Sequence, residues 1–163
     1  MRAFPLMATA LLALAPIHAA TAQDAMGSPN MVESGGYVVH FNAVPTTQIP
    51  PEAARSYRIT RSPNRALLNI AVQKKGEAAN QAVAAEVQAS ATNLTGQRRD
   101  LSVREVRDGG SIYYLAETGI SHLETLNFEV AVLPAEASQP ITLRFQQQFF
   151  TDAVSAERGG EID

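Results

Sequence analysis

Apolar and polar residues alternate along most of the chain. Tyr37, Val39 and Phe41 fall on one face of the first such stretch, and His40 and Asn42 fall on the other. This period of two is that of a half-buried β-strand. Six further stretches have strand patterns, at residues 66–73, 83–92, 98–106, 111–117, 126–132 and 141–150. Short strands separated by turns predict an all-β fold, an immunoglobulin-like antiparallel β-sandwich of about seven strands over residues 35–151.

One short helical turn is expected near residues 51–57, because Pro51 suits the first position of a helix. It leads into "RSPNRALLNIAV", residues 61–72. Pro63 favours a turn before the strand, whose core-facing row would include Leu68 and Ile70. Asn69 then faces the opposite way, so we interpret the stretch as a turn joined to a strand.

The first 22 residues have the pattern of a secretory signal peptide. Arg2 precedes the apolar run "AFPLMATALLALAPI", which is too short and too interrupted by proline to span a membrane, and Ala20-Thr21-Ala22 matches a cleavage site. The expected organisation is a signal peptide at 1–22, a flexible segment at 23–34, the domain, and a flexible tail at 152–163.

Charge and cysteine content narrow the class of protein. Removing 22 of the 163 residues leaves 141, with 12 basic and 16 acidic side chains and a net charge of −4. This balance argues against nucleic acid as a partner. The chain has no cysteine, so we expect neither disulfides nor a lipid anchor on an N-terminal cysteine. A periplasmic protein of a Gram-negative bacterium fits best, with release to the medium as the alternative.

No catalytic constellation is apparent. The chain lacks H-E-x-x-H, G-x-S-x-G, phosphate-loop and dinucleotide motifs. His40 and His122 are the histidines left after cleavage, and a metal site normally needs three or four convergent donors. We therefore expect no catalytic residue, metal or cofactor. The rival hypothesis is an enzyme acting on cell-wall or small anionic substrates, with a histidine working beside Glu117 or Glu124.

Four arginines lie close together in the sequence. A helix over 51–60 would place two of them on one face. Paired guanidinium groups there would suit a carboxylate, a phosphate or an anionic polymer, whereas charge runs more often cover a solvated face. The candidate binding surface comprises Arg55, Arg58, Arg61, Asn64, Arg65 and, from another strand, Tyr114.

Tyr113 and Tyr114 point to opposite faces of one strand, so only one can enter the core; the other is either a contact residue or packs on a neighbouring strand. The last strand, 141–150, carries three glutamines on a polar side. At a sheet edge it would offer free backbone groups to a partner strand. The pattern favours the alternative, an ordinary closing strand.

Several segments together resemble the bacterial domain-of-unknown-function family 4426. They are "PPEAARSYRITRSPNRALLNIAV", "NLTGQRRDLSVREVRDGGSIYYLAET", "ETLNFEV" and "LRFQQQFF", and with the intervening residues they run from about Tyr37 to Asp152. The resemblance implies a small exported proteobacterial domain and supplies neither an activity nor site residues.

The sequence thus predicts a non-enzymatic exported module that binds an envelope protein or an anionic ligand. The arginines and the hairpin turn at 107–110 are its expected contact surfaces. A chaperone-like role, in which an edge strand pairs with a client, is the third hypothesis. The pattern does not indicate an oligomeric state.

Overall fold

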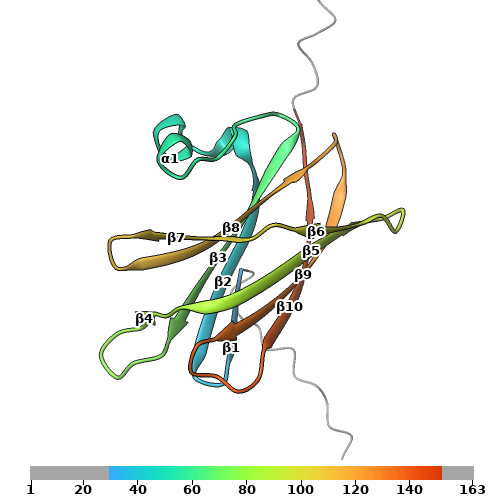
Figure 1. The fold of residues 1–163 in the computed structure, drawn as a ribbon. Coiled ribbons are helices and arrows are strands. Elements are labelled where there is room, and N and C mark those ends of the chain that lie inside the picture. The colour runs from blue at the N-terminus through green and yellow to red at the C-terminus, as the bar shows by residue number, and fades with distance from the viewer. Residues whose placement is uncertain (1–29, 152–163) are drawn as a thin grey trace, which may run out of the picture.

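A computed structural model describes residues 30–151, which form two packed antiparallel sheets (Figure 1). The first sheet contains β1 (Met31–Ser34), β2 (Tyr37–Pro45), β3 (Arg65–Lys74), β4 (Gln81–Ala82), β7 (Arg104–Asp108) and β8 (Ser111–Gly119). The second contains β5 (Ala85–Asn93), β6 (Arg98–Leu101), β9 (Thr125–Pro134) and β10 (Ile141–Gln148). The predicted β-sandwich is confirmed.

The order of strands differs between the sheets. The first runs β1-β2-β3-β8-β7, with β4 pairing one end of β3, and the second runs β10-β9-β5-β6. The inward rows of both sheets form the core, in which Phe128, Leu68 and Val39 are almost fully buried. Phe145 lies between Phe41 and Phe128, with ring centroids at 4.7 Å and 4.9 Å. Such aromatic packing contributes strongly to core stability.

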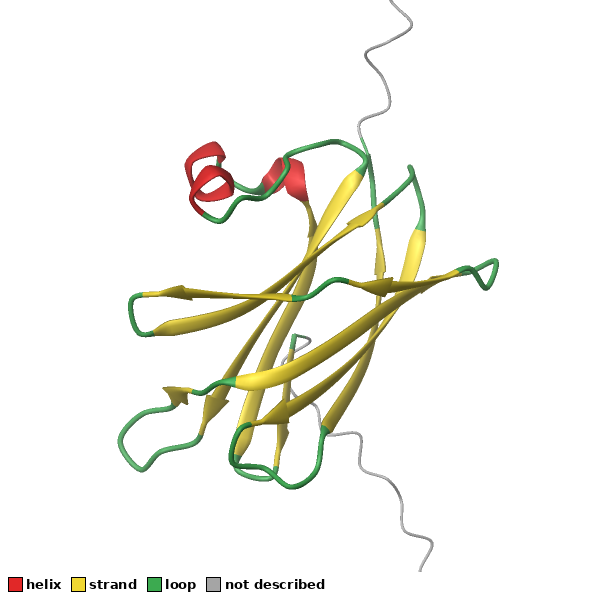
Figure 2. Cartoon of the chain, viewed as in Figure 1, coloured by secondary structure: helices red, strands yellow, loops and turns green. Residues whose placement is uncertain are grey.

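The expected helical turn is present as α1 (Pro51–Ser56), and a 3-10 turn, η1 (Thr46–Gln48), precedes it. Figure 2 shows both outside the two sheets, at one end of the molecule. Proline at the start of α1 has its φ pre-set for a helix and lacks the N–H that the first turn cannot use.

The described residues form more strands than the seven expected, because neighbouring stretches of the chain pair with strands of different sheets. The predicted strand 98–106 divides between Leu101 and Arg104, because β6 pairs with β5 while β7 pairs with β8 in the other sheet. Just before the predicted strand 83–92, β4 pairs with β3 in the first sheet, whereas β5 begins at Ala85 and pairs with β9 in the second.

Met31–Ser34 departs from the flexible segment expected at 23–34. It forms β1 along the edge of β2, and Val32 packs against the core. Tertiary pairing therefore overrides a polar, turn-rich composition. The signal peptide at 1–22, the rest of that segment and the tail at 152–163 lie outside the described residues.

Candidate functional site

The outward face of the first sheet carries a second apolar cluster, separate from the core of the sandwich. Leu67 of β3 and Leu115 of β8 contribute from the sheet. Ala54 and Ile59 cover them from residues 46–64, which we call the covering segment. Burying these side chains fixes the covering segment against the sheet.

A buried threonine closes the base of the covering segment. Thr46 is 0% exposed, and its Oγ1 accepts a hydrogen bond from Ser62 N at 2.9 Å and donates one to Ser62 O at 3.1 Å. Arg61 Nη2 donates to Thr47 O at 2.8 Å. The two ends of the covering segment are thereby held together.

Side chains from β7 and β8 fasten its tip. Arg104 Nη2 donates to the carbonyl oxygen of Tyr57, and Glu117 Oε2 accepts from Thr60 N at 3.3 Å. The Tyr57 hydroxyl donates to Asp108 Oδ2 at 2.6 Å. That bond is the main reason why the pKa of Tyr57 lies above its ordinary value, with burial adding to the shift.

A pocket of about 250 Å³ opens between the covering segment and the first sheet. We call it the outer-face pocket. Its walls are mostly apolar, with a few polar groups, as in typical small-molecule sites. The lining residues are Asn42, Val44, Ile49, Ala53, Tyr57, Ile59, Leu67, Asn69, Tyr113 and Leu115.

Two asparagines are the amide-bearing residues of this lining. Asn42 and Asn69 are direct partners across β2 and β3, so their side chains lie side by side on one face. Asn69 Oδ1 is buried and has no hydrogen-bond partner in the described part of the chain. An unpaired buried acceptor costs about 1–3 kcal/mol, so this amide is a candidate contact for a ligand.

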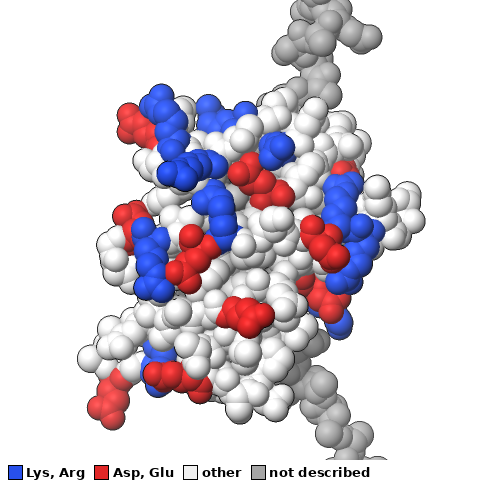
Figure 3. Space-filling model, in the orientation of Figure 1, with Lys and Arg blue, Asp and Glu red and all other residues white. Residues whose placement is uncertain are grey.

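The predicted arginine surface does not converge on one site. Arg58 lies beyond the end of α1 with φ of 53°, so it does not share a helix face with Arg55. Arg65 forms an ion pair with Glu117 at 3.2 Å, and Arg61 binds backbone as described above. Figure 3 shows basic and acidic side chains mixed over this face.

Asn64 is exposed and lies in the turn before β3. Its backbone contacts position that turn, because Asn64 O accepts from Ile120 N at 3.0 Å and Asn64 N donates to Ser62 Oγ at 3.3 Å. Asn64 therefore lies in a structural turn at the end of the covering segment, away from the lining of the outer-face pocket.

Tyr114 requires a correction, because it is 4% exposed and belongs to the core rather than to a binding surface. Its hydroxyl accepts from Ala85 N at 2.7 Å and donates to Glu105 Oε2 at 3.0 Å. Burial raises the pKa of Tyr114. Tyr113, on the opposite face of β8, is the tyrosine that lines the outer-face pocket.

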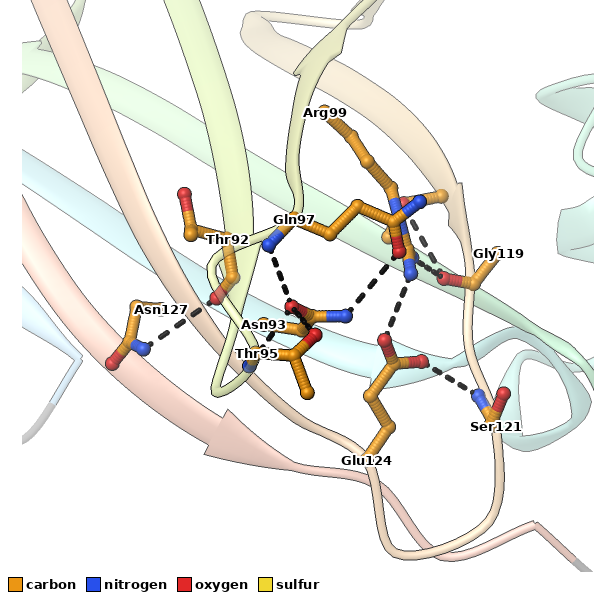
Figure 4. A network of polar contacts seen from close by, with 10 residues as sticks. Thr92, Asn93, Thr95, Gln97, Arg99, Gly119, Ser121, Glu124 and Asn127 are labelled. Carbon is orange, nitrogen blue, oxygen red and sulfur yellow. Dashed lines mark hydrogen bonds and ion pairs between the residues drawn. The ribbon is translucent and has the colours of Figure 1, made fainter.

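The two histidines of the enzyme hypothesis lie in different parts of the fold, and His122 shares the turn before β9 with Glu124. His40 Nε2 lies 3.3 Å from Gln73 Oε1, whereas His122 is exposed in a distant turn. Glu124 pairs with Arg99 at 2.8 Å and accepts from Ser121 N. Figure 4 shows this pair joining β6 to the loop before β9. Both carboxylates proposed as catalytic partners are thus in ion pairs.

Among residues 30–151, no group of three or more histidine, cysteine, aspartate or glutamate side chains is placed to hold a metal ion. No helix among the same residues is long and apolar enough to cross a membrane.

A second hollow, of about 510 Å³, separates the edges of β2 and β10. Gln146, Gln147 and Gln148 line one side of it, together with Phe150, which is 63% exposed. In the described part of the chain β10 pairs with β9 alone, so the polar strand predicted at 141–150 does lie at a sheet edge.

The sequence pattern did not identify Asn42 and Asn69 as site residues. Asn69 stands alone within an apolar strand, which is a usable signal, but its pairing with Asn42 depends on strand register. Thr46 and Tyr57 gave no signal of their roles, because their partners lie far along the chain.

Comparison with known proteins gives one close family and one shared fold. The family model described as "Domain of unknown function (DUF4426)" matches residues 31–152. A DUF4426 family protein from Pseudomonas aeruginosa PAO1 is similar in structure, with a TM-score of 0.65 and 31% sequence identity, over 75% of this chain and 94% of that one. No curated protein matches this chain.

FetP of uropathogenic Escherichia coli strain F11 has a TM-score of 0.53 at 8% identity, over 74% of this chain and 93% of its own. A copper-bound FetP variant has a TM-score of 0.54 at 8% identity, over 74% and 94%. At this identity the likeness shows the fold alone.

Proposed function

Since this chain belongs to the DUF4426 family, whose domain has no known function, we propose that it is an exported, non-enzymatic binding module. It holds one component of the bacterial envelope in the outer-face pocket. The observation that carries this proposal is a preformed apolar pocket lined by Asn69, whose buried amide oxygen has no hydrogen-bond partner among the described residues. Clefts of this composition are the usual form of ligand sites.

The way the pocket is built supports binding. The covering segment is held at its base by Thr46 and at its tip by Arg104, so the cleft exists before a ligand arrives. A preformed site loses less conformational entropy on binding. The leader-like residues 1–22 support export to the periplasm, and the net charge after cleavage supports a partner other than nucleic acid.

The proposal is for binding without turnover. The lining of the outer-face pocket includes two tyrosines, and the remaining lining side chains are apolar or amides. General acid–base or nucleophilic catalysis normally uses histidine, a carboxylate, lysine, tyrosine or an activated hydroxyl. The Tyr57 hydroxyl already donates to Asp108, and this bond raises the pKa of Tyr57, which disfavours its use as a base. The copper of the FetP variant does not extend to this chain, because the likeness concerns the fold.

Retention of envelope components tests this function. The protein is expressed from its full sequence, immobilised, and incubated with a periplasmic extract, and retained small molecules are identified by mass spectrometry. Ala53→Leu, which adds bulk inside the pocket, should lose the retained component. Ala131→Leu makes the same change on the outward side of β9 and serves as the matched control.

The component should also be recovered chemically unchanged. A component that both variants retain as well as the unmodified protein does, or one that is converted during incubation, would contradict the proposal.

Strand addition is a second candidate function, favoured by the open edge of β10 beside the 510 Å³ hollow. An extended client would bond to the backbone of that edge. A proline placed in β10 should then abolish client capture, whereas Arg61→Ala should leave it unchanged. Capture that survives the proline in a folded variant would exclude this mode.

A further inference from the structure

We infer that the outer-face pocket takes a small neutral aromatic molecule that bears one N–H or O–H group and binds through the Asn69 amide. This inference rests on the proposed function, because it assumes that the pocket is a ligand site. Four features carry it: the volume, the aromatic wall, the unpaired amide oxygen and the neutral lining.

The volume limits the size of the ligand. A cavity of about 150 Å³ is enough for benzene, and the outer-face pocket has about 250 Å³. One ring with a substituent, or two fused rings, therefore fills it. A larger ligand would have to extend past the covering segment into solvent.

The wall suits a flat apolar ring. Tyr57 from the covering segment and Tyr113 from β8 both line the pocket, together with Ile49, Leu67 and Leu115. Aromatic rings favour offset-stacked or edge-to-face contacts with each other. An aromatic ligand gains these contacts in addition to the apolar area that it buries.

The polar group follows from Asn69. Its Oδ1 has no partner among the described residues, and an amide oxygen accepts but does not donate. This oxygen is buried in the structure, so binding requires rotation about the Cβ–Cγ bond, a broad torsion in asparagine, to turn it toward the ligand. A ligand N–H or O–H then supplies the missing donor, with the neighbouring Asn42 offering a second amide.

Neutrality follows from the charges around the pocket. The lining contains no aspartate, glutamate, lysine, arginine or histidine among residues 30–151. The two charged residues that contact Tyr57 of the lining are already hydrogen-bonded, since Asp108 accepts from Tyr57 Oη and Arg104 donates to Tyr57 O. An ionised ligand would lose hydration here without gaining a counter-charge.

Indole and indene provide a matched pair of probes. They have nearly the same shape, but only indole has an N–H donor. The chain contains no tryptophan, so indole fluorescence reports the probe without an indole background from the protein. Indole is titrated directly, and indene is measured by its displacement of indole, using protein expressed from the full sequence.

We expect indole to bind about fivefold to tenfold more tightly than indene, the ratio given by one net neutral hydrogen bond. Asn69→Leu should abolish this ratio while retaining indene binding, because it replaces the amide with an apolar group of similar size. Should Asn69→Leu fail to fold, Asn69→Val gives the same comparison, because valine is also apolar and suits a β-strand. Ala53→Leu should weaken both probes, and Ala131→Leu neither.

The two proposals fail separately. Equal binding of both probes, or a preference for indole that survives Asn69→Leu, overturns the role of Asn69. If neither indole nor indene binds, the inference that the ligand is aromatic is wrong. The proposed function depends instead on whether a component of the extract is retained in a way that Ala53→Leu removes.

Discussion

Thr46→Val isolates the two hydrogen bonds that close the base of the covering segment. Valine has nearly the shape of threonine, so the buried site keeps its packing, but it has no hydroxyl. The change removes the bond that Ser62 N donates and the bond that Ser62 O accepts. Any loss of stability therefore reports the hydroxyl rather than a cavity.

The magnitude follows from what each partner retains. Ser62 O still accepts from Arg65 N at 3.2 Å, so its loss is about one net hydrogen bond, or ~1 kcal/mol. Ser62 N loses the Thr46 acceptor; in a half-buried position this costs about 1–2 kcal/mol, toward the lower part of the range for an unpaired group. We expect a loss of about 2–3 kcal/mol in the free energy of unfolding.

Urea unfolding followed by circular dichroism measures this loss. With a slope of about 2 kcal/mol/M, the midpoint should fall by roughly 1 M at unchanged slope. Thr46→Ser is the control, because it keeps the hydroxyl and removes one methyl group, at a cost of about 1 kcal/mol. Hydrogen exchange should accelerate at Ser62 N in the valine variant and remain near normal in the serine variant.

The stabilising role of the Thr46 hydroxyl is refuted if the valine variant is as stable as the serine variant. It is also refuted if Ser62 N keeps its protection in the valine variant. Either result would mean that the apolar cluster under Ala54 and Ile59 alone holds the covering segment.

Two further predictions concern the core and the acid limit of stability. Phe128→Ala should lower the free energy of unfolding by about 3–5 kcal/mol in urea titrations, because Phe128 is buried and stacks on Phe145; the exposed Phe150→Ala should stay within about 0.5 kcal/mol, and a small effect at both positions would contradict this packing. The Arg107 guanidinium, and then the Tyr114 hydroxyl, hold the pKa of Glu105 below its ordinary value. The stability from Glu105 is therefore present above that ordinary pKa and is lost as the pH falls through the lower folded pKa. In melting temperatures measured as a function of pH, Glu105→Gln should therefore show a smaller fall in this acid range. Glu52→Gln is the control. A pH profile that Glu105→Gln leaves unchanged would show that Glu105 contributes no stability there.

The fold class could be predicted because period-two patterns are local. Each expected strand overlaps an observed strand, and the family resemblance carried by motifs such as "LRFQQQFF" is confirmed. The division of 98–106 could not be predicted, since it depends on which strands lie beside Leu101 and Arg104 after folding. Strand pairing is non-local and leaves no period in the sequence.

The candidate site was harder to predict from the sequence, for the same reason. Arginines attract attention in a sequence because their charge is visible there, yet Arg65 is paired with Glu117 in the fold. Asn69 was correctly placed on the outward face of its strand, but its importance appears only when β2 and the covering segment surround it. A cleft is a property of packed elements, and a linear pattern shows only its separate walls.

The short join between β6 and β7 has a consequence for how the molecule folds. Residues 102 and 103 alone separate β6, in the second sheet, from β7, in the first. The two sheets therefore cannot move apart while β6 and β7 both keep their backbone hydrogen bonds. Unfolding should therefore be a single cooperative event. Pairings such as β5 with β9 and β3 with β8 also join distant parts of the chain, and this high contact order places refolding in the millisecond-to-second range.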